Sequence, residues 1–428
     1  MRSLILTFIY IIVFTAVAEA ESAYYYYGQY FRITSSNTVE LIKPIKGENM
    51  TLKQEYSGDF VIYNFIPING NAYFVTKIAD SAFEGSTITS LTLGKYIDSI
   101  GESACANCKT INEFYSNEKL AYIGNNAFNG CSNLSKVLFS DSLTYIGNGA
   151  FDGCSNLSEV LLPENLTYIG DRAFKSCKLQ EELSIPSSVV SIGQAAFFGT
   201  KISTLNLRPK ELKIGEYAFA LIPNFEIINI SSLTDWCNYV FDSVYSNPLY
   251  YAKTLKLNNE TIVDLDLNNE QITSIPIDAF IKQNTIKTVK LGPNLETISN
   301  KAFYTSSIDS VFIASKTPPT INEDSFTLAT YIKSVLTVPF GCSEIYRETP
   351  YWSSFKTIIE ENESSGIDNF TIKKGVIRIN GRNISISKPI QLVIYSIDGK
   401  CLFNGISNSY SFTSPGVYIV NGVKYSIK

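Results

Sequence analysis

The 428-residue sequence contains no histidine. This absence removes the usual general base, the usual activator of serine and cysteine nucleophiles, and the commonest zinc ligand. Paired carboxylates could still perform acid–base chemistry, as they do in glycosidases, but no motif in the chain marks such a pair. The composition therefore argues against an enzyme and predicts neither a metal site nor a cofactor. A hydrolase that uses carboxylates is kept as a remote alternative.

Basic clusters and long apolar runs are also missing. Lys and Arg number 35 against 40 Asp and Glu, a formal net charge of −5, which argues against a nucleic-acid partner. An apolar run from Leu4 to Ala18 precedes a small-x-small pattern that ends at Ala20. The run is too short to cross a bilayer, so residues 1–20 are predicted to be a cleaved signal peptide. No transmembrane segment is expected in the mature chain, which is predicted to be secreted or at the cell surface.

What the sequence does contain is a repeat. A phenylalanine returns at steps of 22 or 23 residues over most of the chain, within the phrase A-F-x-G-C-x-N-L-x-x-V-x-L-P-x-x-L-x-x-I-G-x-x. A fixed period of this size is typical of a solenoid, in which each repeat is one coil stacked on the last. The repeated position is occupied by Phe83, Cys105, Phe128, Phe151, Phe174, Phe197, Phe219, Phe280, Phe303 and Phe326.

The pattern within one coil predicts a strand and two turns. Leu157, Val160 and Leu162 form the pattern L-x-x-V-x-L, whose alternating part predicts a short strand with one face inward, and Pro163 ends that strand. Gly170 is expected to supply backbone freedom where the chain turns back. Because every coil sends apolar side chains inward, stacking the coils buries a continuous apolar column. Since each coil contains a strand, the fold is predicted to be mainly β.

These motifs resemble a known family. The stretch IGNNAFNGCSNLSKVLFSDSLTYIGNGAF and its neighbours are similar to the leucine-rich repeats of the BspA-like family of bacterial surface and secreted proteins. The resemblance covers roughly residues 55–360, including an irregular coil at 233–259 and a closing segment at 337–360. It implies a right-handed solenoid of about 22–23-residue coils with a cap at each end. It also implies adhesion to host matrix proteins, other bacteria or surface glycans.

Both ends of a solenoid need a cap, because open coils expose apolar surface and strand edges. The expected boundaries are 21–78 for the N-terminal capping strands and 79–360 for the solenoid. In the first of these, Asn69-Gly70-Asn71 predicts a hairpin turn. At the other end, three bulky side chains are expected to plug the last coil: Tyr351, Trp352 and Phe355.

The C-terminal residues 361–428 do not follow the 23-residue repeat. Residues 361–369 have the composition of a linker, and 370–428 contain short alternating strands typical of a small β-sandwich. The segments VIYSIDGK (393–400) and PGVYIV (415–420) resemble the C-terminal sorting domain of the type IX secretion system of Bacteroidetes. This resemblance implies contact with outer-membrane export machinery. An ordinary accessory β-domain is the alternative.

Cysteines form a ladder at a spacing of 23. Stacked coils lie about 4.8 Å apart, as neighbouring strands do, so disulfides between rungs are possible in principle. The family precedent favours buried thiols that pack as small hydrophobes. The position of Cys105, which takes the core phenylalanine place, argues against a redox or zinc site at the Cys105-x-x-Cys108 pair. The ladder consists of Cys108, Cys131, Cys154 and Cys177.

Two polar positions are assigned structural roles. Asn133 and Asn156, each just before the first leucine of a coil, are expected to bond the backbone of a neighbouring coil. Asp264 and Asp266 alternate with leucines as on a strand, and we expect a solvated face there rather than a cation site.

Two outward rows are the candidate ligand contacts. Tyrosines precede the I-G of three successive coils, and a second row occupies an outward position of the strand. Exposed apolar and aromatic patches often mark interaction surfaces, although stacking that only stiffens the solenoid is the alternative. The rows are Tyr122, Tyr145 and Tyr168, and Tyr115, Leu138 and Leu161.

The sequence therefore predicts a secreted or cell-surface, adhesin-type binding protein for host matrix proteins, other cells or glycans. A glycan suits the tyrosine row, and a protein suits the outward leucines. The alternative is a structural scaffold of the cell envelope that has no external ligand.

Overall fold

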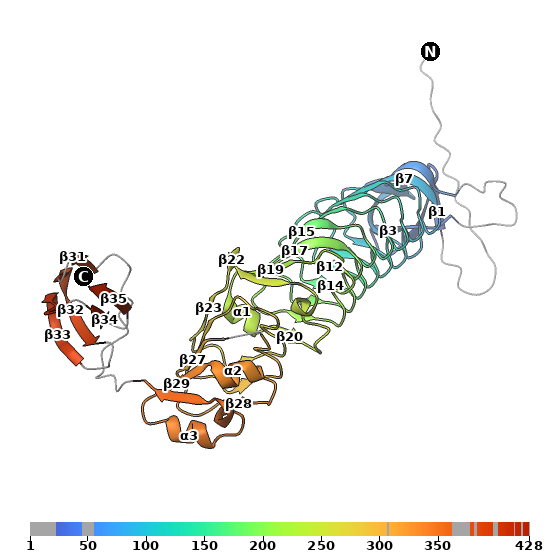
Figure 1. Ribbon diagram of the computed structural model, residues 1–428. Coiled ribbons are helices and arrows are strands. Elements are labelled where there is room, and N and C mark those ends of the chain that lie inside the picture. Colours follow the sequence, from blue (N-terminus) through green and yellow to red (C-terminus); the bar gives the residue numbers. More distant parts are fainter. Residues whose placement is uncertain are drawn as a thin grey trace, which may run out of the picture. The chain divides into compact units, whose positions relative to one another are not determined.

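The computed structural model describes residues 23–44, 55–305 and 308–361, and, nearer the C-terminus, 377–380, 383–396, 401–414, 416–420 and 423–427. The chain divides into two compact units, Met1–Asn362 and Glu363–Lys428 (Figure 1). The predicted signal peptide lies outside the described residues, as does the predicted linker apart from Glu361.

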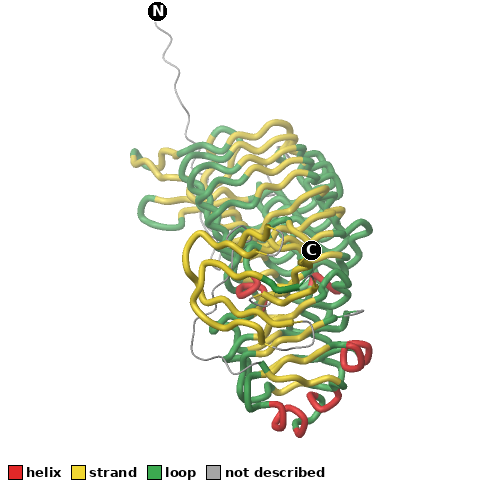
Figure 2. Tube along the Cα trace, turned by 60° about the vertical axis from the view of Figure 1, so that its left-hand side comes forward, coloured by secondary structure: helices red, strands yellow, loops and turns green. Residues whose placement is uncertain are grey.

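The first unit is a β-solenoid, which confirms the predicted fold (Figures 1 and 2). Each regular coil contributes one strand to a broad face and one two-residue strand to a narrow face, and turns form the third side. The broad face consists of three sheets: β4 (Ser57–Val61), β7 (Thr87–Thr92), β9 (Glu113–Tyr115), β11 (Lys136–Leu138) and β13 (Glu159–Leu161); β15 (Gln180–Ile185), β17 (Lys201–Leu207), β19 (Ile227–Ile230), β21 (Thr254–Leu257) and β22 (Glu260–Thr261); β23 (Asp264–Leu267), β25 (Thr288–Leu291), β27 (Ser310–Ile313), β29 (Val335–Val338) and β30 (Thr357–Glu360).

The narrow face is a twelve-stranded sheet followed by a three-stranded one. Its strands are β1 (Ala23–Tyr26), β2 (Gln29–Ile33), β3 (Thr38–Ile42), β5 (Phe65–Ile68), β6 (Asn71–Ile78), β8 (Ser99–Ile100), β10 (Tyr122–Ile123), β12 (Tyr145–Ile146), β14 (Tyr168–Ile169), β16 (Ser191–Ile192), β18 (Lys213–Ile214) and β20 (Val240–Phe241), then β24 (Ser274–Ile275), β26 (Thr297–Ile298) and β28 (Thr320–Ile321). The described helices are short: α1 (Leu233–Cys237), α2 (Leu328–Lys333), α3 (Ser343–Glu348) and the 3₁₀ turns η1 (Pro248–Tyr250) and η2 (Trp352–Ser354).

A column of phenylalanines runs through the core. Phe128 stacks on Phe151 with ring centroids 5.2 Å apart, and Phe151 stacks on Phe174 at 5.3 Å. Cys105 takes the same place one coil earlier and is fully buried, as its register predicts. Phenylalanine N–H groups of the column also donate to the next coil, as from Phe128 to the Ala150 carbonyl at 2.7 Å and from Phe151 to the Ala173 carbonyl at 2.7 Å. The turn side is therefore held by backbone hydrogen bonds as well as by apolar packing.

The glycine of each I-G pair is required by close approach of the backbones. A Cβ at Gly170 would lie 2.5 Å from the backbone nitrogen of Asn148 in the preceding coil, a distance that no side chain tolerates. The same holds for Gly147, where a Cβ would lie 2.6 Å from the carbonyl carbon of Gly124. Neither glycine has a positive φ, so the expectation that Gly170 supplies backbone freedom is wrong.

The side chains that bond neighbouring backbones follow these glycines. Asn125 Oδ1 accepts from the N–H of Asn148 at 2.9 Å, and Asn148 Oδ1 accepts from the N–H of Asp171 at 2.8 Å. The residues predicted for this role, Asn133 and Asn156, are exposed like Asn148, but their side chains make no such bond within the described residues. That assignment is wrong, because the asparagine ladder lies on the narrow face.

Each end of the solenoid carries its own structure. β5 and β6 form an antiparallel hairpin through Asn69-Gly70, and β1, β2 and β3 extend the narrow face beyond it. At the other end Trp352 and Phe355 are buried and stacked 5.9 Å apart, whereas Tyr351 is 41% exposed. The third plug residue is therefore Tyr346, which is fully buried and donates from its hydroxyl to the Ser315 carbonyl at 2.8 Å.

The second unit is a small all-β structure. Its described strands are β31 (Ile377–Asn380), β32 (Asn383–Ser396), β33 (Cys401–Ser411), β34 (Gly416–Val420) and β35 (Val423–Ile427). β32 is long enough to pair with β31 near its start and with β34 near its end, so one sheet can fold over itself as in a small sandwich. Its core includes Leu392, Ile394, Phe412 and Tyr418.

Candidate binding surface

The predicted tyrosine row lies on the narrow face. Tyr122, Tyr145 and Tyr168 are register partners in β10, β12 and β14, and both ring pairs are stacked with centroids 4.7 Å apart. Tyr122 is 40% exposed, and the other two are half-buried. Burial raises the pKa of Tyr145, and its two tyrosine neighbours add to the effect.

This stacking limits what the row can bind. Each ring covers the face of the next, so the row presents ring edges and hydroxyls rather than a series of open aromatic faces. The two free faces, at Tyr122 and Tyr168, lie beside Ser99 and Ser191, their register partners in the flanking strands. A sugar packs against an open aromatic face. The geometry therefore gives little support to a glycan on this row and matches a stiffening role.

The second predicted row lies on the broad face. Tyr115, Leu138 and Leu161 are register partners in β9, β11 and β13. Their side chains are exposed, by 46%, 41% and 74% respectively. The hydroxyl of Tyr115 donates to Glu113 Oε2 at 2.5 Å, which fixes the ring above its own strand. This row is thus an open strip of large apolar side chains crossing three coils.

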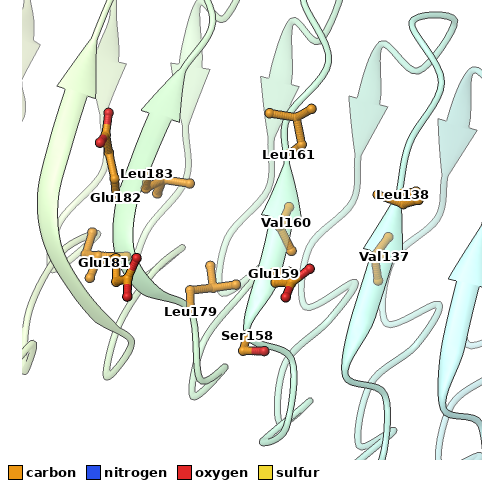
Figure 3. Close-up of a pocket in the computed structure, with 11 residues that line it drawn as sticks. Val137, Leu138, Ser158, Glu159, Val160, Leu161, Leu179, Glu181, Glu182 and Leu183 are labelled. Carbon is orange, nitrogen blue, oxygen red and sulfur yellow. The ribbon is translucent and has the colours of Figure 1, made fainter.

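The broad-face row ends at an open hollow between β13 and β15 (Figure 3). Among the described strands, β13 pairs only with β11 and β15 pairs only with β17, so the ladder is interrupted here. The hollow has a volume of about 300 Å³. We call it the notch; its lining is Val137, Leu138, Ser158, Glu159, Val160, Leu161, Leu179, Glu181, Glu182, Leu183 and Ile202.

The notch follows from a one-residue change in the repeat. In the coil that starts at Phe151 the inward residues are Leu157 and Val160, but in the next coil they are Leu179 and Leu183, one residue further apart. The extra residue is accommodated at Glu181, which has a left-handed backbone with φ 61°, and the register with β17 shifts beside it. Such a bulge bends the strand away from its neighbour.

The cysteine ladder is reduced and buried. The seven cysteines whose side chains are described are free. Cys131 Sγ donates to the Cys105 carbonyl at 3.0 Å, and the thiols of Cys154 and Cys177 make the equivalent bonds. Burial raises the pKa of the Cys154 thiol well above its usual range. These thiols pack as small polar-tipped hydrophobes, as the family resemblance implied.

The described residues contain no cluster of three or more His, Cys, Asp or Glu side chains that could hold a metal ion. Asp264 and Asp266 point outward while Leu265 and Leu267 are buried, which confirms the expected solvated face. Asp266 pairs with Lys290 at 3.4 Å.

One aromatic cluster escaped prediction. Around the irregular coil, Tyr217 stacks on Tyr245 at 5.2 Å, Tyr245 meets Tyr250 edge-on at 5.5 Å, and Tyr250 meets Tyr251 edge-on at 5.1 Å. Lys282 Nζ lies 5.1 Å from the Tyr250 ring centroid. Burial raises the pKa of Tyr251 to about 12. The concentration of tyrosine in YSNPLYY is the signal available in the sequence, but the lengthened coil hides the register.

Comparison with protein families identifies the repeat. The model of the BspA type leucine rich repeat region matches residues 76–181, 180–249 and 256–380, more than half of the chain. The chain belongs to this family. The matched family is defined by a leucine-rich repeat region and not by an enzymatic domain. No curated protein matches the sequence.

Several solved structures are similar to the BspA-type chain. A leucine rich cell surface protein from Faecalibacterium prausnitzii is 18% identical with a TM-score of 0.46, covering 81% of this chain and 97% of its own. A leucine-rich repeat protein from Bacteroides ovatus is 18% identical with a TM-score of 0.32, covering 77% and 86%. The T. pallidum leucine rich repeat protein is 22% identical with a TM-score of 0.38, covering 46% and 86%.

Within the described residues, no helix has the length and apolar content that a membrane crossing requires.

Proposed function

We propose that this BspA-type chain is a secreted or surface-displayed, non-catalytic adhesin whose broad face binds proteins of the host matrix or of other cells. The observation that carries this proposal is the row of Tyr115, Leu138 and Leu161, three large exposed side chains held in register on adjacent rungs. Large apolar groups in a line favour contact with an extended protein surface.

The rigidity of the solenoid supports this role. Under two of the three rungs the inward side chains, Phe114 and Val137, are fully buried, and under the third Val160 is partly buried. A partner therefore meets side chains whose positions are fixed before binding, and little ordering entropy is lost on association.

The test is binding of the purified chain to immobilised matrix proteins and to a glycan array. Three samples are compared: the unmodified chain, a broad-row variant (Tyr115→Ser, Leu138→Ser, Leu161→Ser) and a narrow-row variant (Tyr122→Ala, Tyr145→Ala, Tyr168→Ala). We expect saturable binding to at least one protein, lost in the broad-row variant and retained in the narrow-row variant. Loss only in the narrow-row variant would move the site to the tyrosines. Absence of binding by folded samples contradicts the adhesin proposal.

A scaffold of the cell envelope is the second candidate. The stacked, half-buried rings of Tyr145 and Tyr168 favour it, because their contacts are made with each other rather than with solvent. A scaffold predicts tight association with cells and no affinity for any protein or glycan on the panel.

We also propose that residues 1–20 direct export and that residues 370–428 deliver the chain to the cell surface. The support is the sequence pattern of both segments, together with a C-terminal unit that is compact on its own. A chain that ends at Glu361 should fail to reach the surface while remaining folded. Normal surface delivery of that shorter chain contradicts the sorting role and leaves an accessory β-unit.

A further inference from the structure

The notch exposes a residue that the repeat otherwise buries. Val137 and Val160 hold the same place in successive coils, and both point toward the core. Val137 is fully buried, whereas Val160 is only partly buried. The difference arises because β11 has a strand on each side and β13 has one only on the side of β11. An apolar side chain at the interrupted rung is therefore accessible from outside.

The rim of the notch is acidic. Its lining contains three carboxylates, Glu159, Glu181 and Glu182, and no lysine or arginine. All three side chains are exposed. Lys136 on the neighbouring rung forms an ion pair with Glu159 at 3.8 Å, and Glu182 accepts a hydrogen bond from the neutral amide of Asn206. The rim thus carries three negative charges, of which Lys136 pairs with one, at Glu159.

The two flanking strands offer backbone groups as well. β13 and β15 are each the last strand of a sheet, and each presents an edge to the notch. An unpaired strand edge accepts an extended peptide by main-chain hydrogen bonds, while pockets select its alternate side chains. Figure 3 shows Leu161, Val160 and Glu159 along one side of the hollow and Leu179, Glu181 and Glu182 on the other.

We propose that the notch binds an extended basic polypeptide segment: one of its apolar side chains packs against Val160 and Leu161, and its lysines or arginines pair with Glu159, Glu181 and Glu182. The charge of the rim selects a basic partner over an acidic one, and the strand edges select a polypeptide over a glycan. This inference rests on the proposed protein-binding function, and it narrows the partner to a basic segment seated at the end of the broad-face row.

The repeat itself supplies a variant that closes the notch. Replacing residues 178–181 by the residues at 155–158 of the preceding coil (Lys178→Ser, Leu179→Asn, Gln180→Leu, Glu181→Ser) removes the extra residue between the inward positions. The change leaves length and net charge unaltered. A second variant, Glu159→Gln/Glu181→Gln/Glu182→Gln, keeps the backbone and removes the rim charge. Its matched control removes three exposed carboxylates elsewhere on the solenoid, Asp264→Asn/Glu270→Gln/Glu296→Gln.

The probes are labelled peptides with alternating residues: lysine and valine, glutamate and valine, and lysine and serine. Fluorescence anisotropy of each is measured with the full chain at low and physiological salt. We expect the lysine–valine peptide alone to bind well. Its affinity should fall about tenfold in the glutamine variant, where three exposed ion pairs are lost, and should fall further in the closed-notch variant. The matched control should retain the unmodified affinity, and added salt should weaken binding.

Each contrary outcome is distinct. Equal binding of the lysine–serine peptide, or equal loss in the matched control, would show unspecific charge attraction and overturn the proposal. Unchanged binding by the folded closed-notch variant places the peptide elsewhere and also overturns it. If no peptide binds but a matrix protein is still captured through the broad row, the notch proposal fails and the adhesin proposal stands. If the peptide binds and the panel does not, the adhesin proposal alone fails.

Discussion

The coil 174–197 pairs with its neighbours differently on the narrow face and on the broad face of the solenoid. On the narrow face β14, β16 and β18 stay paired rung by rung. On the broad face the pairing stops between β13 and β15. The glycines of the narrow face leave no room for a displaced backbone, whereas a single left-handed residue on the broad face, Glu181, absorbs the extra residue between the inward positions. A solenoid can therefore stay continuous along one face while it opens a site on another.

The largest effect is expected from a side chain placed where the glycines of adjacent coils approach each other on the narrow face. Gly147→Val should destabilise the chain by at least about 3 kcal/mol, because its Cβ would meet the backbone of Gly124 at 2.6 Å. Gly153 has φ 75°, and a Cβ there would find no other atom nearer than 3.7 Å, so alanine meets only backbone strain. Gly153→Ala should cost about 1–2 kcal/mol. Urea unfolding followed by circular dichroism measures both, and equal losses contradict the close-approach argument.

The second-largest effect on stability is expected in the buried phenylalanine column between the two faces. Phe151→Ala removes a fully buried ring stacked between Phe128 and Phe174, and we expect a loss of about 3–5 kcal/mol. Leu161→Ala, at the exposed end of the broad-face row, should change stability by less than about 0.5 kcal/mol. Thermal melting of the two variants gives the comparison. A large loss at Leu161 would mean that the row contributes to folding rather than to binding.

A smaller loss of stability should distinguish the asparagines that bond a neighbouring coil from those that were predicted to do so. Asn148→Ala leaves the Asp171 N–H without its 2.8 Å acceptor and should cost about 1 kcal/mol. Asn156→Ala, which truncates an exposed side chain, should lie within about 0.5 kcal/mol of the unmodified chain. Denaturant midpoints of the Asn148→Ala and Asn156→Ala variants measure the two losses of stability. A larger loss for Asn156→Ala would mean that Asn156, and not Asn148, bonds the neighbouring coil.

The smallest effect concerns pH and the tyrosine row. The folded-state pKa values of Tyr145 and Tyr168 are raised by burial, so the row contributes stability that is fully present below the ordinary tyrosine pKa of about 10 and is lost as pH rises through the folded values. Tyr122→Phe/Tyr145→Phe/Tyr168→Phe removes this dependence. Its melting temperature should fall less than that of the unmodified chain between about pH 9 and 11. Parallel curves contradict coupling between stacking and ionisation.

The fold could be predicted from the sequence because the residues that repeat, above all the phenylalanines, have the same inward position in every coil. Phe128, Phe151 and Phe174 recur at one spacing and must share one environment, so the solenoid and its buried column follow directly. Burial of Cys105 follows from the same register. Outward and inward positions on the strands follow from alternation, and Asp264 and Asp266 lie as expected.

Contacts between coils are harder to predict. Whether Asn133 or Asn148 reaches the neighbouring backbone depends on the direction of a side chain relative to the stacking axis, which spacing alone does not determine. The role expected of Gly170 is wrong for the same reason, since the limiting contact comes from a residue one coil away. The notch needs a comparison of two coils residue by residue, because its origin at Glu181 is a shift of one position within an unchanged period.

Hydrogen exchange across the interrupted rung tests the central claim most directly. Mass spectrometry would follow amide exchange in the segments 135–139, 158–162 and 180–185 of the unmodified chain and of the closed-notch variant. We predict that the two segments bordering the notch exchange faster than 135–139 in the unmodified chain, and that the variant slows both to the rate of 135–139. Equal protection of all three segments in the unmodified chain would contradict an open broad face.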